Sequence, residues 1–110
     1  MADQDLQRKW ALIKALLKNA CADFAEQPQA VIAPHSKRIV EACHFLDHNE
    51  LGLALDAIAE AGRATSPRGR FWDSLRQAAS QMERTEDAQE FQLLWVEAAS
   101  ISLAKHMCRA

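Results

Sequence analysis

Apolar residues recur along most of the chain at alternating steps of three and four, the period of helices that turn one side toward a core. The first run predicts a helix from about Asp5 to Glu26. Pro28 and Pro34 interrupt the period after it, because proline inside a helix removes a hydrogen bond and clashes with the preceding turn. The core-facing stripe of this helix is expected to consist of Leu6, Trp10, Ile13, Leu17, Ala20 and Phe24.

Two further helices are predicted after the prolines. The second covers Ser36–Asp47, and Phe45 falls nearly opposite its core stripe. Asn49 is expected to cap the third helix, Glu50–Ala61, which Gly62 would end. The inward residues of the second helix are Ile39, Ala42, Cys43 and Leu46. Those of the third are Leu51, Ala54, Leu55 and Ile58.

The fourth helix is expected to follow a loop over Gly62–Gly69. Ser66 is interpreted as its cap and Pro67 as its first residue, a position that tolerates proline because the missing amide hydrogen has no partner there. Trp72 lies at the edge of its apolar stripe. The stripe itself is formed by Phe71, Leu75, Ala78 and Met82.

The last helix is predicted from Thr85 to about Met107, because a hydroxyl cap followed by two acids favours a helix start. One face carries Phe91, Leu94, Trp95, Ala98 and Ile101. The opposite side is apolar as well, with Leu93, Val96, Leu103 and Met107. Such a helix is either central in the fold or half of an oligomer interface, so residues 86–107 are a candidate dimer contact.

Together these patterns predict an all-α fold, a single-domain irregular bundle of about five helices over residues 1–110. Residues 85–110 are a possible C-terminal helical extension of that domain. The composition agrees, because 49% apolar and 25% charged residues are ordinary for a globular protein. A chain of 110 residues has room for one core.

Charge, hydropathy and cysteine content limit the partners, the cellular location and the redox state that we expect. A formal net charge of −2 lacks the positive field of a dedicated nucleic-acid binder, so we expect no nucleic-acid partner. No stretch approaches the roughly 18 apolar residues of a membrane span, and residues 1–6 lack the apolar run of a signal peptide. We therefore expect a cytoplasmic protein without membrane contact. Three cysteines without a CxxC motif favour reduced thiols that pack as small core residues.

Residue types used in catalysis and metal binding are present, but they do not converge. His44 and His48 are four apart on one helical face, a spacing that can hold a metal ion, yet no third ligand accompanies them. Asp56 and Glu60 could divide acid and base roles only in a pocket that separates their pKa values. No Gly-rich phosphate loop occurs. We therefore expect no enzymatic activity, no cofactor and no metal.

The outward side of the third predicted helix has the composition of a binding surface. Leu53 lies there beside Asp56 and Glu60, so an apolar side chain is surrounded by acids. An apolar centre with a charged rim is the usual anatomy of a protein interface. The alternative is that another helix, such as the last one, covers this side. The candidate partner-binding residues are Phe45, Asp47, Glu50, Leu53, Asp56 and Glu60.

Residues 45–82 carry an ordered pattern: a helix end with Asn49, the run Glu-Leu-Gly-Leu-Ala-Leu-Asp at Glu50–Asp56, a loop, and then Phe71, Trp72, Leu75, Ala79 and Met82. In this pattern, over about a third of its length, the chain resembles the small helical immunity proteins of bacterial polymorphic-toxin and contact-dependent growth inhibition systems, including the Maf-type group. The resemblance implies a protein that binds a cognate toxin domain, often a nuclease, and blocks it by protein–protein contact.

Two other classes of function stay open. A small helical DNA-binding regulator would show salt-sensitive affinity for duplex DNA through Lys37, Arg38, Arg63, Arg68 and Arg70. A homo-oligomeric helical scaffold would assemble through the two apolar faces of the last helix. An immunity protein instead requires one-to-one binding without turnover, and a toxin encoded immediately upstream.

Overall fold

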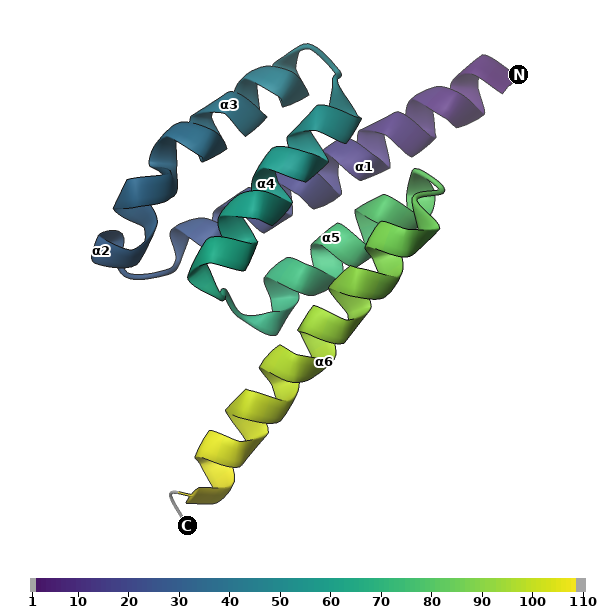
Figure 1. Ribbon diagram of the computed structural model, residues 1–110. Helices are drawn as coiled ribbons and strands as arrows, with labels where there is room; N and C mark the ends of the chain where they lie inside the picture. The colour runs from purple at the N-terminus through teal and green to yellow at the C-terminus, as the bar shows by residue number, and fades with distance from the viewer. Residues whose placement is uncertain (1, 109–110) are drawn as a thin grey trace.

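The computed structural model describes residues 2–108 and the side chains of residues 4–100. Helices make up nearly all of this range, and it contains no strand. The all-α bundle with five long helices is therefore confirmed, with one four-residue helix and one 3-10 turn in addition (Figure 1). The elements are α1 (Ala2–Ala25), α2 (Gln29–Ile32), η1 (Ala33–His35), α3 (Ser36–Asp47), α4 (Leu51–Thr65), α5 (Gly69–Gln81) and α6 (Thr85–Cys108).

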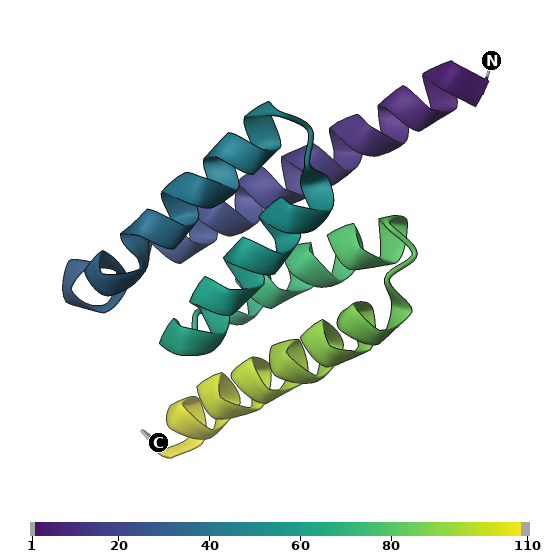
Figure 2. The ribbon, with the colours of Figure 1, turned by 45° about the horizontal axis from the view of Figure 1, so that its top comes forward.

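Helix α5 lies in the middle of the arrangement. α1 and α6 both pack against it, and the α3–α4 hairpin covers the bundle through contacts of α4 with α1 and α5. Figures 1 and 2 show that α1 and α6 run past opposite ends of α5, so the N-terminus and the C-terminus lie at opposite ends of the molecule. The molecule is therefore elongated, with principal extents of 55 × 26 × 19 Å.

The core is organised around a row of aromatic rings from three helices. Phe71 of α5 packs edge-on against Trp72, with 4.8 Å between centroids, and Phe24 of α1 lies 6.4 Å from Phe71. Trp72 in turn stacks on Phe91 of α6 at 5.9 Å. Trp72 was expected at the edge of its stripe but is 3% exposed, because α6 covers that side of α5. The largest fully buried side chains are Phe71, Phe91, Leu17, Leu55, Ile58 and Leu75.

The first two positions of the predicted α1 stripe are not in the core. Leu6 is 44% exposed and Trp10 is 49% exposed, whereas Ile13, Leu17 and the later stripe residues are buried as predicted. The helical period is correct, but α5 ends at Gln81 and gives the first turns of α1 no neighbour. The stripe therefore continues along α1 beyond the end of the bundle.

The orientation predicted for α3 needs a correction. Its bounds, Ser36–Asp47, match the prediction, and Ala42 and Leu46 are buried. Cys43, expected to face inward, is exposed, and Phe45, expected opposite the stripe, is half-buried and packs against the core. α3 packs mainly on α4, so its buried side is rotated toward Phe45.

Asn49 closes α3 rather than opening α4. It has a positive φ of 56°, its amide donates to the Leu46 carbonyl, and the Glu50 amide donates to the Phe45 carbonyl at 2.8 Å. These bonds form a Schellman motif, in which asparagine is a favoured left-handed residue. The N-cap of α4 is Glu50, and its side chain makes no capping hydrogen bond.

Helix α4 does not stop at Gly62, contrary to the prediction. It continues to Thr65, and Ser66 closes it in the left-handed conformation with φ 54°. Gly62 is buried inside the helix because the Phe71 ring passes directly over it. The predicted capping role of Ser66 and Pro67 is also wrong, since α5 begins at Gly69 with Arg68 as its N-cap.

Helix α6 begins at Thr85 as predicted and extends to Cys108. Phe91 is buried, whereas Trp95 is only partly covered, and Leu93 and Val96 are exposed on the outer side. Ile101, Leu103 and Met107 lie outside the residues whose side chains are described. Within the described residues, no helix has the length and apolar content needed to cross a membrane.

The two described thiols are neighbours in space. Cys21 of α1 is half-buried and packs against the core, whereas Cys43 of α3 is exposed. Burial, together with the adjacent Cys43 thiol, raises the pKa of Cys21 to about 12. Cys21 therefore behaves as the small core residue that was predicted, and Cys43 does not.

Candidate interaction surface

The outward side of α4 remains uncovered. Leu53 is 51% exposed, and α6 does not cover it. Asp56 and Glu60 follow on the same side of the helix, and Glu50 and Asp47 lie at the α3–α4 turn, all of them exposed. We call the five residues Asp47, Glu50, Leu53, Asp56 and Glu60 the α4 face. An apolar side chain thus stands among acids at the surface, as the sequence predicted.

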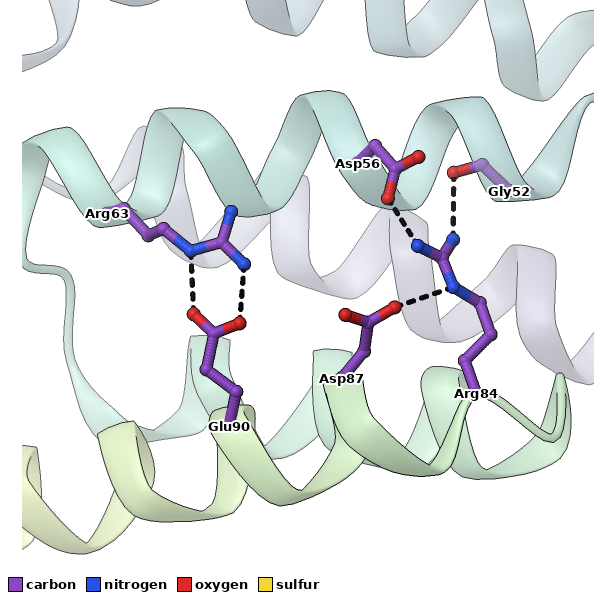
Figure 3. A network of polar contacts seen from close by, with 6 residues as sticks. All are labelled: Gly52, Asp56, Arg63, Arg84, Asp87 and Glu90. Atoms are coloured by element: carbon purple, nitrogen blue, oxygen red, sulfur yellow. Dashed lines mark hydrogen bonds and ion pairs between the residues drawn. The ribbon is translucent and has the colours of Figure 1, made fainter.

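The structure brings a basic side chain to Asp56 that the sequence analysis did not anticipate. Arg84, at the turn between α5 and α6, donates to Asp56 Oδ1 at 2.6 Å and to the Gly52 carbonyl at 3.2 Å (Figure 3). Its Nε also pairs with Asp87 Oδ2 at 2.7 Å. Arg84 therefore ties the start of α6 to the first turns of α4 and neutralises part of the charge of Asp56.

Glu60 has a basic partner from a different element. It forms an ion pair with Arg38 of α3. Asp47 and Glu50, by contrast, form no ion pair within the described part of the chain. The uncompensated negative charge of the α4 face therefore lies next to Leu53 at the α3–α4 turn, and Asp56 and Glu60 have a structural role on its flanks. Phe45, the sixth candidate, packs inward.

A second link joins the last turn of α4 to α6. Arg63 donates two hydrogen bonds to the Glu90 carboxylate, from Nε at 2.7 Å and from Nη2 at 2.8 Å (Figure 3). Bidentate pairs of this kind hold both planar groups in one orientation. The hydrogen bonds from Arg63 lower the pKa of Glu90 below its ordinary value of 4.5.

Replacing Glu90 with glutamine is expected to destabilise the protein at neutral pH by less than about 1 kcal/mol, because the pair is partly exposed and screened by water. Since the folded-state pKa of Glu90 is lowered, its contribution is present at neutral pH and is lost as the pH falls through that pKa. Urea unfolding of Glu90→Gln and wild type should therefore differ at pH 7 and converge below pH 4.5. Glu97→Gln, an exposed change later on the same helix, is the control and should leave the free energy of unfolding at pH 7 nearly unchanged.

An open groove lies at the other end of α4, between the α4–α5 turn and α6. Its volume is about 920 Å³. The buried or half-buried part of its lining comes from Gly62, Pro67, Trp72, Leu94 and Ala98. The charged residues on its rim are Arg63, Arg68, Glu90 and Glu97. This groove was not predicted from the sequence, because it is formed by the left-handed turn at Ser66 and by α6 continuing past the start of α5.

The basic residues of the DNA-binding alternative do not form an open positive patch. Arg38 pairs with Glu60, Arg63 with Glu90, and Arg70 with Asp23. Each of these ion pairs brings a carboxylate to the position a phosphate would occupy. Lys37 and Arg68 lie on separate elements, α3 and the α4–α5 turn.

His44 of α3 and His48, the C-cap of that helix, are both exposed, and His48 Nδ1 lies 2.9 Å from the His44 carbonyl oxygen. Within the described residues, no group of three or more His, Cys, Asp or Glu side chains is placed to hold a metal ion. No family model, curated protein or solved structure matches the chain.

Proposed function

We propose that this protein binds the toxin domain of a bacterial polymorphic-toxin or contact-dependent growth inhibition system and blocks it by protein–protein contact, without catalysis. The observation that carries the proposal is the half-exposed Leu53 three residues after Glu50, an exposed acid that, like Asp47 at the end of α3, has no ion pair within the described residues. The resemblance of residues 45–82 to immunity proteins supports the same assignment.

The charge of this surface suits a basic partner. A toxin that acts on nucleic acid needs a positive surface at its active site, because it must bind phosphates. Acids at the α3–α4 turn would accelerate encounter with such a surface, and burial of Leu53 would slow dissociation. The same negative charges would repel acidic proteins and would give neutral proteins no electrostatic attraction, so both would compete poorly for this surface.

The ion pairs that flank the α4 face support binding in a different way. Arg84 anchors Asp56 from the α6 side, and Arg38 anchors Glu60 from the α3 side. These contacts hold α4 in place before a partner arrives, which reduces the ordering cost of association. A standard interface buries about 800 Å² per partner, an area the α3–α4 hairpin can supply. Binding of a toxin inside the producing cell would place the protein in the cytoplasm.

The test uses the C-terminal domain of the protein encoded immediately upstream as the probe. Expression of this domain alone in a heterologous bacterium should stop growth, and coexpression with the present chain should restore it. The purified pair should elute as a one-to-one complex with a mass equal to the sum of both chains. A C-terminal domain from an unrelated toxin locus is the specificity control. If coexpression does not restore growth and the purified proteins form no complex, the proposal is refuted.

A further inference from the structure

The two helices that flank α5 carry most of the large apolar side chains that are exposed in the described range. Of nine such side chains among residues 4–100, six lie on α1 and α6: Leu6, Trp10, Leu12, Leu93, Trp95 and Val96. Exposed tryptophan is uncommon on monomeric domains and is the residue type most enriched at binding hot spots. These two helices therefore need an explanation that the α4 face does not provide.

The first turns of α1 form an apolar projection. Leu6 and Trp10 continue the buried line of Ile13 and Leu17 at steps of four, three and four, so they point to the same side as the core residues. Ile13 is the first buried residue of α1 in the described range. The described residues before it, 2–12, form roughly 15 Å of helix at 1.5 Å per residue.

The groove between the α4–α5 turn and α6 is a hollow that could receive the apolar side chains of α1. α6 continues past the start of α5, whose Gly69 lies level with Trp95. Leu94 and Ala98 continue the line of the buried Phe91 into the groove, where α5 is no longer present to cover them. The volume, about 920 Å³, is within the range of roughly 300–1,000 Å³ typical of ligand pockets and can admit a tryptophan with a neighbouring leucine.

We propose that the first turns of α1 of one copy of this chain dock in the groove between the α4–α5 turn and α6 of a second copy, with Trp10 as the anchor and Leu6 beside it. Each of the two surfaces is the end of a core stripe that lacks a neighbour, and the second copy supplies that neighbour to both. The contact lies outside the α4 face and does not depend on the proposed function.

The charges around the two surfaces allow this docking. Asp5, Arg8 and Lys9 surround Leu6 and Trp10 along α1. On the groove rim, Arg68 and Glu97 are exposed and form no ion pair within the described residues. One cation and one anion on the rim can thus meet an anion and two cations on the helix. The outer side of α6, with Leu93 and Val96, is convex and has no such complement, so we do not place the contact there.

Figures 1 and 2 show the first turns of α1 and the later turns of α6 at opposite ends of the molecule. Because the groove is lined by those later turns of α6, the contact joins different surfaces of the two copies. Such heterologous contacts extend from copy to copy unless the geometry closes a ring. A contact made by the first turns of a single helix is small, and interfaces below about 1,200 Å² are usually weak. Association is therefore expected only at roughly 0.1–1 mM protein.

Sedimentation velocity over that concentration range tests the proposal. The average mass of the wild-type chain should rise with concentration. Trp10→Ala should weaken association at least tenfold by removing the anchor. Ala99 also lines the groove, so Ala99→Arg should weaken association by filling it. Both positions are exposed, so both variants should keep the wild-type circular dichroism spectrum and melting temperature.

Mixing the two variants gives the most specific readout. Ala99→Arg retains Trp10 and Trp10→Ala retains the groove, so the mixture should form heterodimers that cannot extend further. Leu93→Ala, on the outer side of α6, should associate like wild type. A wild-type chain that stays monomeric at 1 mM, a mixture that stays monomeric, or loss of association in Leu93→Ala would each overturn the proposal, the last by moving the contact to the outer side of α6.

Discussion

Replacing Gly62 with alanine is expected to lower the free energy of unfolding by about 2 kcal/mol, although glycine to alanine in a helix ordinarily stabilises by up to about 1 kcal/mol. A Cβ at this position would lie 2.2 Å from Phe71 Cε1, 2.6 Å from Phe71 Cζ and 3.0 Å from Trp72 Cη2. Distances this short require the aromatic rings to move. The close passage of Phe71 over the helix therefore reverses the usual sign of the substitution.

The rings have little freedom to move. Phe71 is fully buried and is held between Phe24 and Trp72, while Trp72 is stacked on Phe91. A shift of Phe71 would displace rings from three helices, and overpacking of a closed core typically costs about 1–3 kcal/mol. For a domain of this size, a loss of 2 kcal/mol corresponds to a decrease of the melting temperature by roughly 10 °C.

Gly52 provides the matched control on the same helix. An added Cβ there would approach only the ends of two flexible side chains, Arg84 Nη1 and Met82 Cε, each at 3.8 Å. Gly52→Ala is therefore expected to leave stability unchanged or to raise it by up to about 1 kcal/mol. Urea unfolding followed by circular dichroism at 222 nm measures both variants. Equal stability of Gly62→Ala and Gly52→Ala would contradict the packing described for Phe71.

Local signals predicted most of the fold. The bounds of α3 and the start of α6 were correct because each rests on nearby residues, the end of the Pro34 interruption in one case and the Thr85 cap with two acids in the other. The buried lines of α1, α4 and α5 follow directly from the helical period. The periodicity of a segment shows that it is a helix and which side is apolar, and both depend on the segment alone.

The errors come from contacts between distant segments. Gly62 was interpreted as a helix end because glycine is frequent there, but it is required as the residue without a side chain beneath Phe71, nine positions further along. The exposure of Trp10 depends on where α5 ends, about seventy residues later. Neither relation leaves a trace in the local pattern of apolar residues.

In the candidate site, too, local features could be predicted from the sequence and contacts between distant segments could not. Exposure of Leu53 could be predicted from its position on the helix, because it lies opposite the buried line of α4. The pairing of Asp56 with Arg84 and of Glu60 with Arg38 could not, since the partners are on other elements. These pairs change the choice of test residues, because reversing the charge of Asp56 or Glu60 would break an intramolecular ion pair as well as change the surface.

The largest loss of binding affinity is therefore expected from substitutions of α4-face residues that form no ion pair within the described residues. The double substitution Glu50→Lys with Leu53→Lys should weaken binding to the upstream toxin domain by about 100-fold, equivalent to about 2.7 kcal/mol. It removes the apolar anchor and places two positive charges against a basic partner, which adds repulsion to lost burial. Both side chains are exposed, so helicity should not change.

A matched control is available on α6. Glu86→Lys with Leu93→Lys makes the same two exchanges of residue type at exposed positions and produces the same net charge. Leu93 is 66% exposed, more than Leu53. A general effect of net charge on binding would weaken both double variants equally, whereas binding at the α4 face affects only the first.

Titration calorimetry of the purified upstream toxin domain with wild type and these two double variants decides whether the α4 face is the binding surface. We expect one-to-one binding by wild type, nearly the same dissociation constant for Glu86→Lys with Leu93→Lys, and a dissociation constant about 100-fold higher for Glu50→Lys with Leu53→Lys. Wild-type affinity in the α4-face variant, with binding lost in the α6 control, would contradict binding at the α4 face.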